Sequence, residues 1–313
     1  MRVLVVVNPR ATAMSPRERD VLAHALGSEA ELEVVETENR GHAAALACRA
    51  MRSGTDVVVA LGGDGTVNEV INGLLTDGVH PGIPALGLVP AGSTNVFVRA
   101  LGFPNDPIEA TGALLEGLRT QTFRPVSMGM ADDRYFCFAA GLGFDAAIVH
   151  GVERKRRQGR RSTHVLYTRV GVSEFFHADR RHPRLHVELS DGTRYDDVYF
   201  TIVANADPWT FVGNRPLHPT PDVSFETGLA VYGRRRMGVR HQRHHHQARR
   251  DGRGTRQRAA DQQRGPAPPR LPRVVLFEGA VGERSGARVR VAADVEVGGG
   301  ERSGIHLTGA RIQ

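Results

Sequence analysis

The segment DVVVALGGDGTVNEVINGLL, residues 56–75, places three glycines, an aspartate and a threonine between two apolar runs. The first run is typical of a buried strand, and the apolar residues after the glycines recur at the spacing of one helix face. Thr66 is expected at the N-cap of that helix, where Glu69, three residues on, would complete a capping box. Since glycine amides can approach a phosphate closely and a helix N-terminus attracts anions, the pattern predicts phosphate binding.

Asp64 is the charged residue inside this loop. Its carboxylate is placed to hold a magnesium ion or to orient a nucleophile. The alternative interpretation is an ordinary tight turn in front of a well-capped helix, which needs no ligand. Taken alone, the motif favours phosphate binding over that alternative.

A second loop has the same design. ALGLVPAGSTNVFVRAL, residues 85–101, comprises an apolar strand, a polar turn and a short helix, and Asn8-Pro9 closes the first apolar run of the chain. Because the carboxyl ends of parallel strands lie at one edge of a sheet, the three turns are expected to share a crevice. Neither a Walker A lysine pattern nor G-x-G-x-x-G follows a strand, so the sequence predicts a nucleotide phosphate site of a different kind.

The elements that must position these loops alternate along the first part of the chain. Apolar runs predict strands at 2–7, 31–36, 56–61 and 85–89, with helical patterns between them. Strands alternating with helices are typical of a doubly wound, parallel-sheet α/β domain. We expect this nucleotide-binding domain to occupy residues 1–122.

The next part, residues 123–233, has the pattern of a mostly antiparallel β domain that would bind the substrate. Strand pairs are predicted around the acidic turn at 131–133 and around Asp191-Gly192, with a further strand within 222–233. A basic helix is expected as an insertion near 152–176. Its run ERKRRQGRRS is either a solvated helix face or a patch for an anionic membrane surface.

The positive charge of the chain is concentrated in one tract. Residues 234–270 hold twelve arginines and two aspartates, whereas the net charge of the whole chain is +7. The remainder is therefore mildly acidic, which argues against nucleic-acid binding. The tract has too few apolar residues to fold and is expected to be disordered, and 271–313 is expected to form degenerate strands. A GC-rich gene read in the wrong frame has such a composition, which motivates the hypothesis of a frameshifted carboxyl end.

Two cysteines exclude a disulfide framework, and no apolar stretch reaches the length of a membrane span. The sequence therefore predicts a cytoplasmic protein.

The segments VVVNP, GGDGTVNEVINGLL, LGLVPAGSTNVFVRALGFP and AAGLGFDAAIV together resemble the diacylglycerol kinase catalytic family, on its bacterial soluble lipid kinase branch. The resemblance runs in order from Val3 to about Tyr232. It implies ATP-dependent phosphorylation of a lipid hydroxyl with Mg²⁺, at a membrane surface, with Asp64 in the catalytic site and Asp145 in the interdomain cleft beside the substrate. The residues that it implies for ATP binding are Asn8, Thr37, Gly62, Gly63, Gly65, Thr66, Asn68 and Ser93.

The chain also departs from the family pattern. Where the family has an acidic metal-binding segment, Glu226 keeps an acid and Ala230 replaces one. Gly298 and Gly300 stand where the family has the acids of its catalytic base, so no base is assigned. The sequence therefore leaves two hypotheses, an active ATP-dependent lipid kinase and a nucleotide-binding relic without catalysis. An NAD kinase, which shares the GGDGT loop, is a weaker third.

Overall fold

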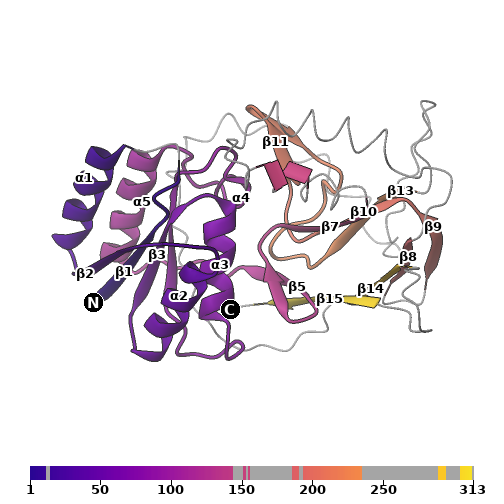
Figure 1. Cartoon of the computed structure of the whole chain (residues 1–313), viewed down its shortest axis with the longest axis horizontal. Helices are drawn as coiled ribbons and strands as arrows, with labels where there is room; N and C mark the ends of the chain where they lie inside the picture. Colours follow the sequence, from indigo (N-terminus) through magenta and orange to yellow (C-terminus); the bar gives the residue numbers. More distant parts are fainter. Residues whose placement is uncertain are drawn as a thin grey trace, which may run out of the picture.

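The computed structural model describes residues 1–11, 15–143, 151–152, 154–155, 185–189, 193–234, 288–293 and 304–311. It has an α/β part at the N-terminus followed by smaller antiparallel sheets (Figure 1). The predicted Asp145, most of the predicted helix at 152–176 and residues 235–270 lie outside the described residues.

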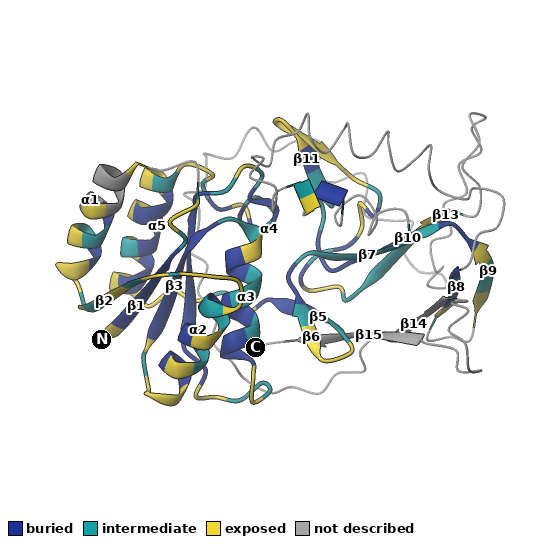
Figure 2. Ribbon diagram, viewed as in Figure 1, coloured by how far each residue is buried: buried dark blue, intermediate teal, exposed yellow. Residues whose placement is uncertain are grey.

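The first sheet is parallel and has four strands in the order β2-β1-β3-β4. The strands are β1 (Arg2–Val7), β2 (Glu31–Glu36), β3 (Val57–Gly62) and β4 (Ala85–Pro90). All residues of β3 and β4 are buried, as expected for continuous apolar runs covered on both faces. β2 lies at the edge and is largely exposed (Figure 2). The predicted strands are thus confirmed.

Five helices cover this sheet within the described residues. They are α1 (Pro16–Gly27), α2 (His42–Arg52), α3 (Asp64–Leu74), α4 (Val96–Ala100) and α5 (Pro107–Thr120). α1 and α5 lie on one face, and α2 and α3 on the other (Figure 1). The sequence analysis missed α5, although Asp106 before Pro107 is a start signal: its carboxylate accepts from the N–H groups of Ile108 and Glu109.

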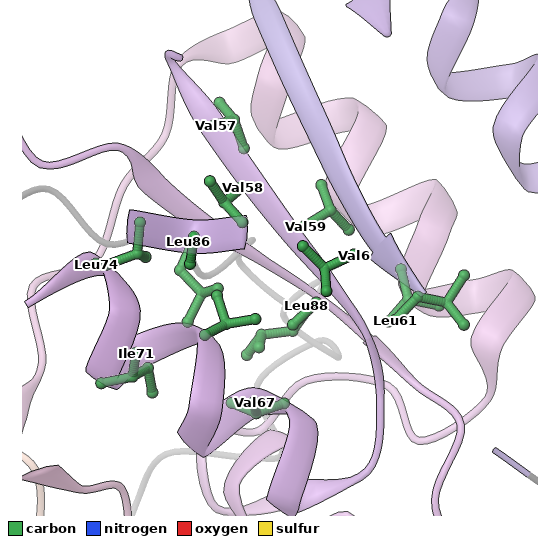
Figure 3. Packing of buried hydrophobic residues seen from close by; sticks show 14 of the residues in the cluster. Val6, Val57, Val58, Val59, Leu61, Val67, Ile71, Leu74, Leu86 and Leu88 are labelled. Atoms are coloured by element: carbon green, nitrogen blue, oxygen red, sulfur yellow. The ribbon is translucent and has the colours of Figure 1, made fainter. Parts of the chain in front are cut away.

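The core of this domain lies on both faces of the sheet, and α3 covers one of them. The predicted apolar face of α3 contributes Val67, Ile71 and Leu74, which pack with strand residues such as Val58 and Leu86 (Figure 3). α2 and α3 approach closely because Gly73 has no side chain: a β-carbon there would lie 2.1 Å from the carbonyl oxygen of Ala44. Close packing of this kind fixes where the N-terminus of α3 points.

Within the described residues, the second part contains three antiparallel sheets. A six-stranded sheet has the order β6-β5-β15-β14-β8-β9, a three-stranded sheet has the order β13-β10-β7, and β11 pairs with β12 alone. The strands are β5 (Ser127–Ala131), β6 (Arg134–Phe136), β7 (Ala139–Gly143), β8 (Leu185–Leu189), β9 (Arg194–Val198), β10 (Phe200–Ala204), β11 (Thr210–Val212), β12 (Arg215–Leu217), β13 (Ala230–Arg234), β14 (Arg288–Ala293) and β15 (Gly304–Arg311).

The two predicted hairpins of this part are confirmed, because β5 pairs with β6 and β8 with β9, both antiparallel. The strand predicted within 222–233 begins only at Ala230. The region 271–313 supplies β14 and β15, which pair with each other and with β8 and β5 in the middle of the six-stranded sheet. No helix among the described residues is long and apolar enough to span a bilayer.

Candidate functional site

The three predicted loops lie together at the carboxyl edge of the parallel sheet. The N–H of Asn8, after β1, donates to the carbonyl of Leu61 at 3.0 Å, and the N–H of Ala91, after β4, donates to the carbonyl of Gly62 at 2.9 Å. Thr37, after β2, donates its N–H to the carbonyl of Val7 at 2.8 Å. These bonds hold the ends of all four strands in one row.

The helix behind the GGDGT loop begins earlier than the sequence predicts. Its N-cap is Gly63, whose carbonyl accepts from the N–H groups of Thr66 and Val67 at 2.9 and 3.1 Å. Thr66 therefore lies inside the first turn, and the predicted capping box with Glu69 is wrong. The Thr66 hydroxyl accepts instead from the Asn8 side chain at 3.0 Å, and a Glu69 oxygen accepts from the N–H of Gly41 at 3.0 Å.

The glycines of the two loops have different surroundings. A β-carbon on Gly62 would lie 2.6 Å from the Thr66 hydroxyl oxygen, and one on Gly92 would lie 2.6 Å from Cα of Gly63. The missing side chain of Gly62 leaves room for Thr66 of the same loop, and that of Gly92 allows the two loops to touch backbone to backbone at Gly63. Gly65 differs, because a β-carbon there would have no heavy atom within 4 Å apart from its chain neighbours and the backbone of its own helix. The N–H groups of Asp64 and Gly65 come too early in α3 to have an acceptor within the helix, and the surface of this first turn is open at Gly65.

Asp64 joins the two loops. Its oxygens Oδ2 and Oδ1 accept from the N–H groups of Val96 and Phe97, each at 3.0 Å, so the side chain caps α4. Burial raises the pKa of the Asp64 carboxyl, and the two N–H groups act in the opposite direction. Since both oxygens already accept hydrogen bonds, the geometry assigns them to holding α4. The catalytic role of Asp64 stays a prediction.

The second loop is braced from within. Asn95 adopts the left-handed conformation with φ of 50°, and its Oδ1 accepts from the N–H of Gly92 at 2.9 Å. Its Nδ2 donates to the carbonyl of Gly92 at 3.1 Å and to Oδ1 of Asn105 at 2.9 Å. Ser93 is exposed at the turn, next to Gly92 and its contact with Gly63. The structure thus brings Asn8, the glycine loop and Ser93 to one edge.

The comparisons with known proteins agree with this arrangement. Residues 2–130 match the family model described as the diacylglycerol kinase catalytic domain. Diacylglycerol kinases of Staphylococcus aureus strains JH9 and Newman are 42% identical over 113 residues, which are 36% of this chain and 34% of theirs. The chain therefore matches about a third of the length of these curated relatives.

Solved structures extend the likeness over both parts of the chain. A diacylglycerol kinase from Bacillus anthracis strain Sterne has a TM-score of 0.59 at 18% identity, covering 99% of this chain and 94% of its own. A putative diacylglycerol kinase from the same strain has a TM-score of 0.61 at 20% identity, covering 98% and 93%. At such identities the likeness shows the fold, and this fold is α/β followed by antiparallel sheets.

The α/β part is joined to the second part through α3. The side chain of Asn72 donates to the carbonyl of Tyr135 at 3.0 Å and accepts from the N–H of Tyr135 at 2.9 Å, so it pairs with the outer strand β6. One turn earlier, Oδ1 of Asn68 accepts from the Cys137 thiol at 3.2 Å. Asn68, predicted to bind ATP, thus directs its side chain at the second part.

We expect Asn72→Ala to lower the free energy of unfolding by about 2 kcal/mol, because two backbone groups of Tyr135 lose their partner. The second part should also loosen from α3. The fluorescence of Trp209, the one tryptophan of the chain, reports on unfolding of the second part, whereas backbone circular dichroism reports on the whole chain. In urea, the Trp209 transition should precede the circular dichroism transition. Thr76→Ala is the control, since that hydroxyl bonds only within α3. If the fluorescence and circular dichroism transitions of Asn72→Ala coincided, at the urea midpoint of the unsubstituted chain, the expectation would be contradicted.

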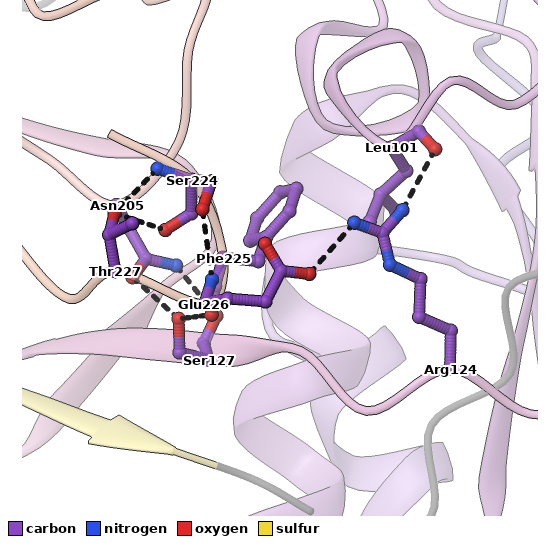
Figure 4. A network of polar contacts seen from close by, with 8 residues as sticks. All are labelled: Leu101, Arg124, Ser127, Asn205, Ser224, Phe225, Glu226 and Thr227. Atoms are coloured by element: carbon purple, nitrogen blue, oxygen red, sulfur yellow. Dashed lines mark hydrogen bonds and ion pairs between the residues drawn. The ribbon is translucent and has the colours of Figure 1, made fainter. Parts of the chain in front are cut away.

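A buried polar network that the sequence analysis missed surrounds Asn205 (Figure 4). Its Nδ2 donates to the carbonyls of Ser127 at 2.6 Å and Cys137 at 2.9 Å, and its Oδ1 accepts from the Ser127 hydroxyl at 3.3 Å. That hydroxyl also donates to the carbonyl of Phe225, whose ring packs edge-on against Phe97 of α4. Asn205 is fully buried, so the network fixes the Phe225 segment beside α4. The sequence signal for this network was only one asparagine, Asn205, directly after the strand β10.

Glu226, the predicted metal ligand, is paired with a cation. Its carboxylate accepts from Arg124 at 2.9 Å, and Arg124 also donates to the carbonyl of Leu101 (Figure 4). Burial raises the pKa of Glu226, but hydrogen bonds from Arg124 and Ser224 outweigh burial and leave the pKa lowered. The described residues contain no group of three or more His, Cys, Asp or Glu side chains able to hold a metal ion. The role of Glu226 as a metal ligand stays a prediction.

Proposed function

We propose that the chain is a lipid kinase that transfers the γ-phosphoryl group of ATP to the hydroxyl of diacylglycerol or a related lipid. The observation that carries the proposal is the open first turn of α3 at Gly65, within a domain of the diacylglycerol kinase family. A phosphate accepted there would meet free N–H groups and the positive end of the α3 dipole. The lipid hydroxyl oxygen would bond to the γ-phosphorus as the bond to ADP breaks, and the hydroxyl proton would pass to solvent water.

The residues around α3 have distinct roles in this proposal. The backbone of Gly63 and Gly65 binds phosphate, and Ser93, exposed on the adjoining loop, adds a hydroxyl donor. Asn8 orients the Thr66 hydroxyl through its 3.0 Å hydrogen bond, and Thr37 lies at the end of β2 in the same row. Asp64 acts by positioning, because its carboxylate keeps the PAGSTN loop against the glycine loop.

The second candidate is a nucleotide-binding relic of the same family. The pairing of Glu226 with Arg124, together with Ala230 at the position of an acid, favours it. The relic would keep the phosphate site on α3 and lack the transfer step.

One assay separates the two candidates. Transfer of label from ATP, supplied with Mg²⁺, to diacylglycerol in mixed micelles is expected of the kinase, while the binding of ATP is followed in parallel by calorimetry. Binding without transfer to any lipid alcohol of the panel would support the relic. Absence of binding would contradict both candidates.

A further inference from the structure

The hairpin of β11 and β12 is a two-stranded sheet with one face attached to the kinase domain. It lies beside α4 (Figure 1). Phe211 is 9% exposed, and the guanidinium of Arg99, from α4, lies 3.4 Å from its ring centroid. Arg99 also donates to the carbonyl of Gly213, at the tip of the hairpin, at 3.2 Å. The hairpin is therefore fastened to the helix that begins at the PAGSTN loop.

The opposite face of the hairpin is apolar and basic. Thr210 pairs with Leu217 and Val212 pairs with Arg215, so these four side chains share one face. On this face Val212 is 58% exposed and Leu217 is 40% exposed, and Arg215, which lies next to both, is exposed as well. Residues 208–217 contain no acid. We call this face of Thr210, Val212, Arg215 and Leu217 the outer hairpin face.

We propose that the outer hairpin face docks on the surface of an anionic phospholipid bilayer. A bilayer interface accepts apolar side chains and attracts a neighbouring cation, and this combination matches Val212, Leu217 and Arg215. The identification of the occupant as a bilayer rests on the proposed function, because the substrate of a lipid kinase resides there. Arg99 would then hold α4, and with it the second phosphate loop, close to the membrane.

Other exposed apolar side chains lie away from this hairpin and offer controls. Ile108 on α5 is 62% exposed, on a helix of the other domain. Its substitution by aspartate removes as much exposed apolar surface as one substitution in the hairpin. The side chain contributes little to the fold, so Ile108→Asp is a matched control.

The test measures co-sedimentation of the full chain with vesicles of phosphatidylcholine and phosphatidylglycerol, without ATP. The double variant Val212→Asp with Leu217→Asp should bind at least about tenfold more weakly than the unsubstituted chain, since two apolar side chains leave the interface. Arg215→Gln should weaken binding about fivefold and make it less sensitive to salt. Ile108→Asp should bind unchanged, and the thermal unfolding midpoints of all variants should agree.

Three results would overturn the proposal. The first is binding of the double variant within about twofold of the unsubstituted chain, which would place the membrane contact elsewhere. The second is an equal loss in Ile108→Asp, which would mark a general effect of added charge. The third is that the unsubstituted chain forms a dimer and binds no vesicles, while the double variant is a monomer. The outer hairpin face would then be a contact between two copies of the chain. Because ATP is absent, vesicle binding succeeds or fails independently of phosphoryl transfer.

Discussion

Asp64→Ala should lower the free energy of unfolding by about 3 kcal/mol and eliminate measurable ATP binding. The carboxylate accepts from the N–H groups of Val96 and Phe97, both buried residues at the start of α4. Without Asp64 these N–H groups lose their acceptor inside the protein. The five-residue helix α4 is too short to stay ordered by itself. The measurement is urea unfolding by circular dichroism, together with calorimetric titration of ATP.

Asp106→Ala is the matched control for Asp64→Ala. Asp106 caps α5 by accepting from the N–H groups of Ile108 and Glu109 at 2.9 and 3.0 Å, in the same chemical manner but at the surface. The Asp106→Ala substitution should lower the free energy of unfolding by about 1 kcal/mol, as is usual for an exposed N-cap, and leave ATP binding unchanged. If Asp64→Ala instead abolished phosphoryl transfer while its unfolding and ATP binding stayed normal, Asp64 would act chemically and the positioning role would be refuted.

The α/β fold could be predicted because its signals are local. Four apolar runs and the helical spacing of Val67, Ile71 and Leu74 are properties of short segments, and the structure confirms them. The start of α3 could not be placed from such signals. The preference of threonine for the N-cap was outweighed by Gly63, which starts the helix while its own backbone packs against Gly92.

The gathering of the three loops at one edge could also be predicted, since parallel strands place their carboxyl ends together. The partners of individual side chains could not. Asp64 lies 32 positions before Val96, and Asn72 lies 63 positions before Tyr135, so both contacts depend on the packing of whole elements. The bonds of Asn205 likewise join residues 78 and 68 positions apart, so they form only when distant segments of the second part pack together.

Gly65→Ala should raise stability and weaken ATP binding at once. Gly65 is the second residue of α3, and alanine at a helical glycine position raises the free energy of unfolding by about 0.5–1 kcal/mol. Apart from its chain neighbours and the backbone of α3 itself, the new β-carbon would meet no heavy atom of the protein within 4 Å. In the proposed complex the same space is taken by a phosphate, so the methyl group should weaken ATP binding about thirtyfold, or about 2 kcal/mol. Thermal unfolding and calorimetric titration measure the two effects.

Gly112→Ala separates the helix effect from the phosphate effect. Gly112 lies within α5, where a β-carbon would also have no heavy atom within 4 Å. This variant should gain the same stability and bind ATP normally, because α5 contributes no loop to the proposed site. Equal ATP affinity in Gly65→Ala and Gly112→Ala would remove the N-terminus of α3 from the phosphate site. If both variants gained stability and only Gly65→Ala lost ATP affinity, the space at Gly65 would serve the ligand and not the fold.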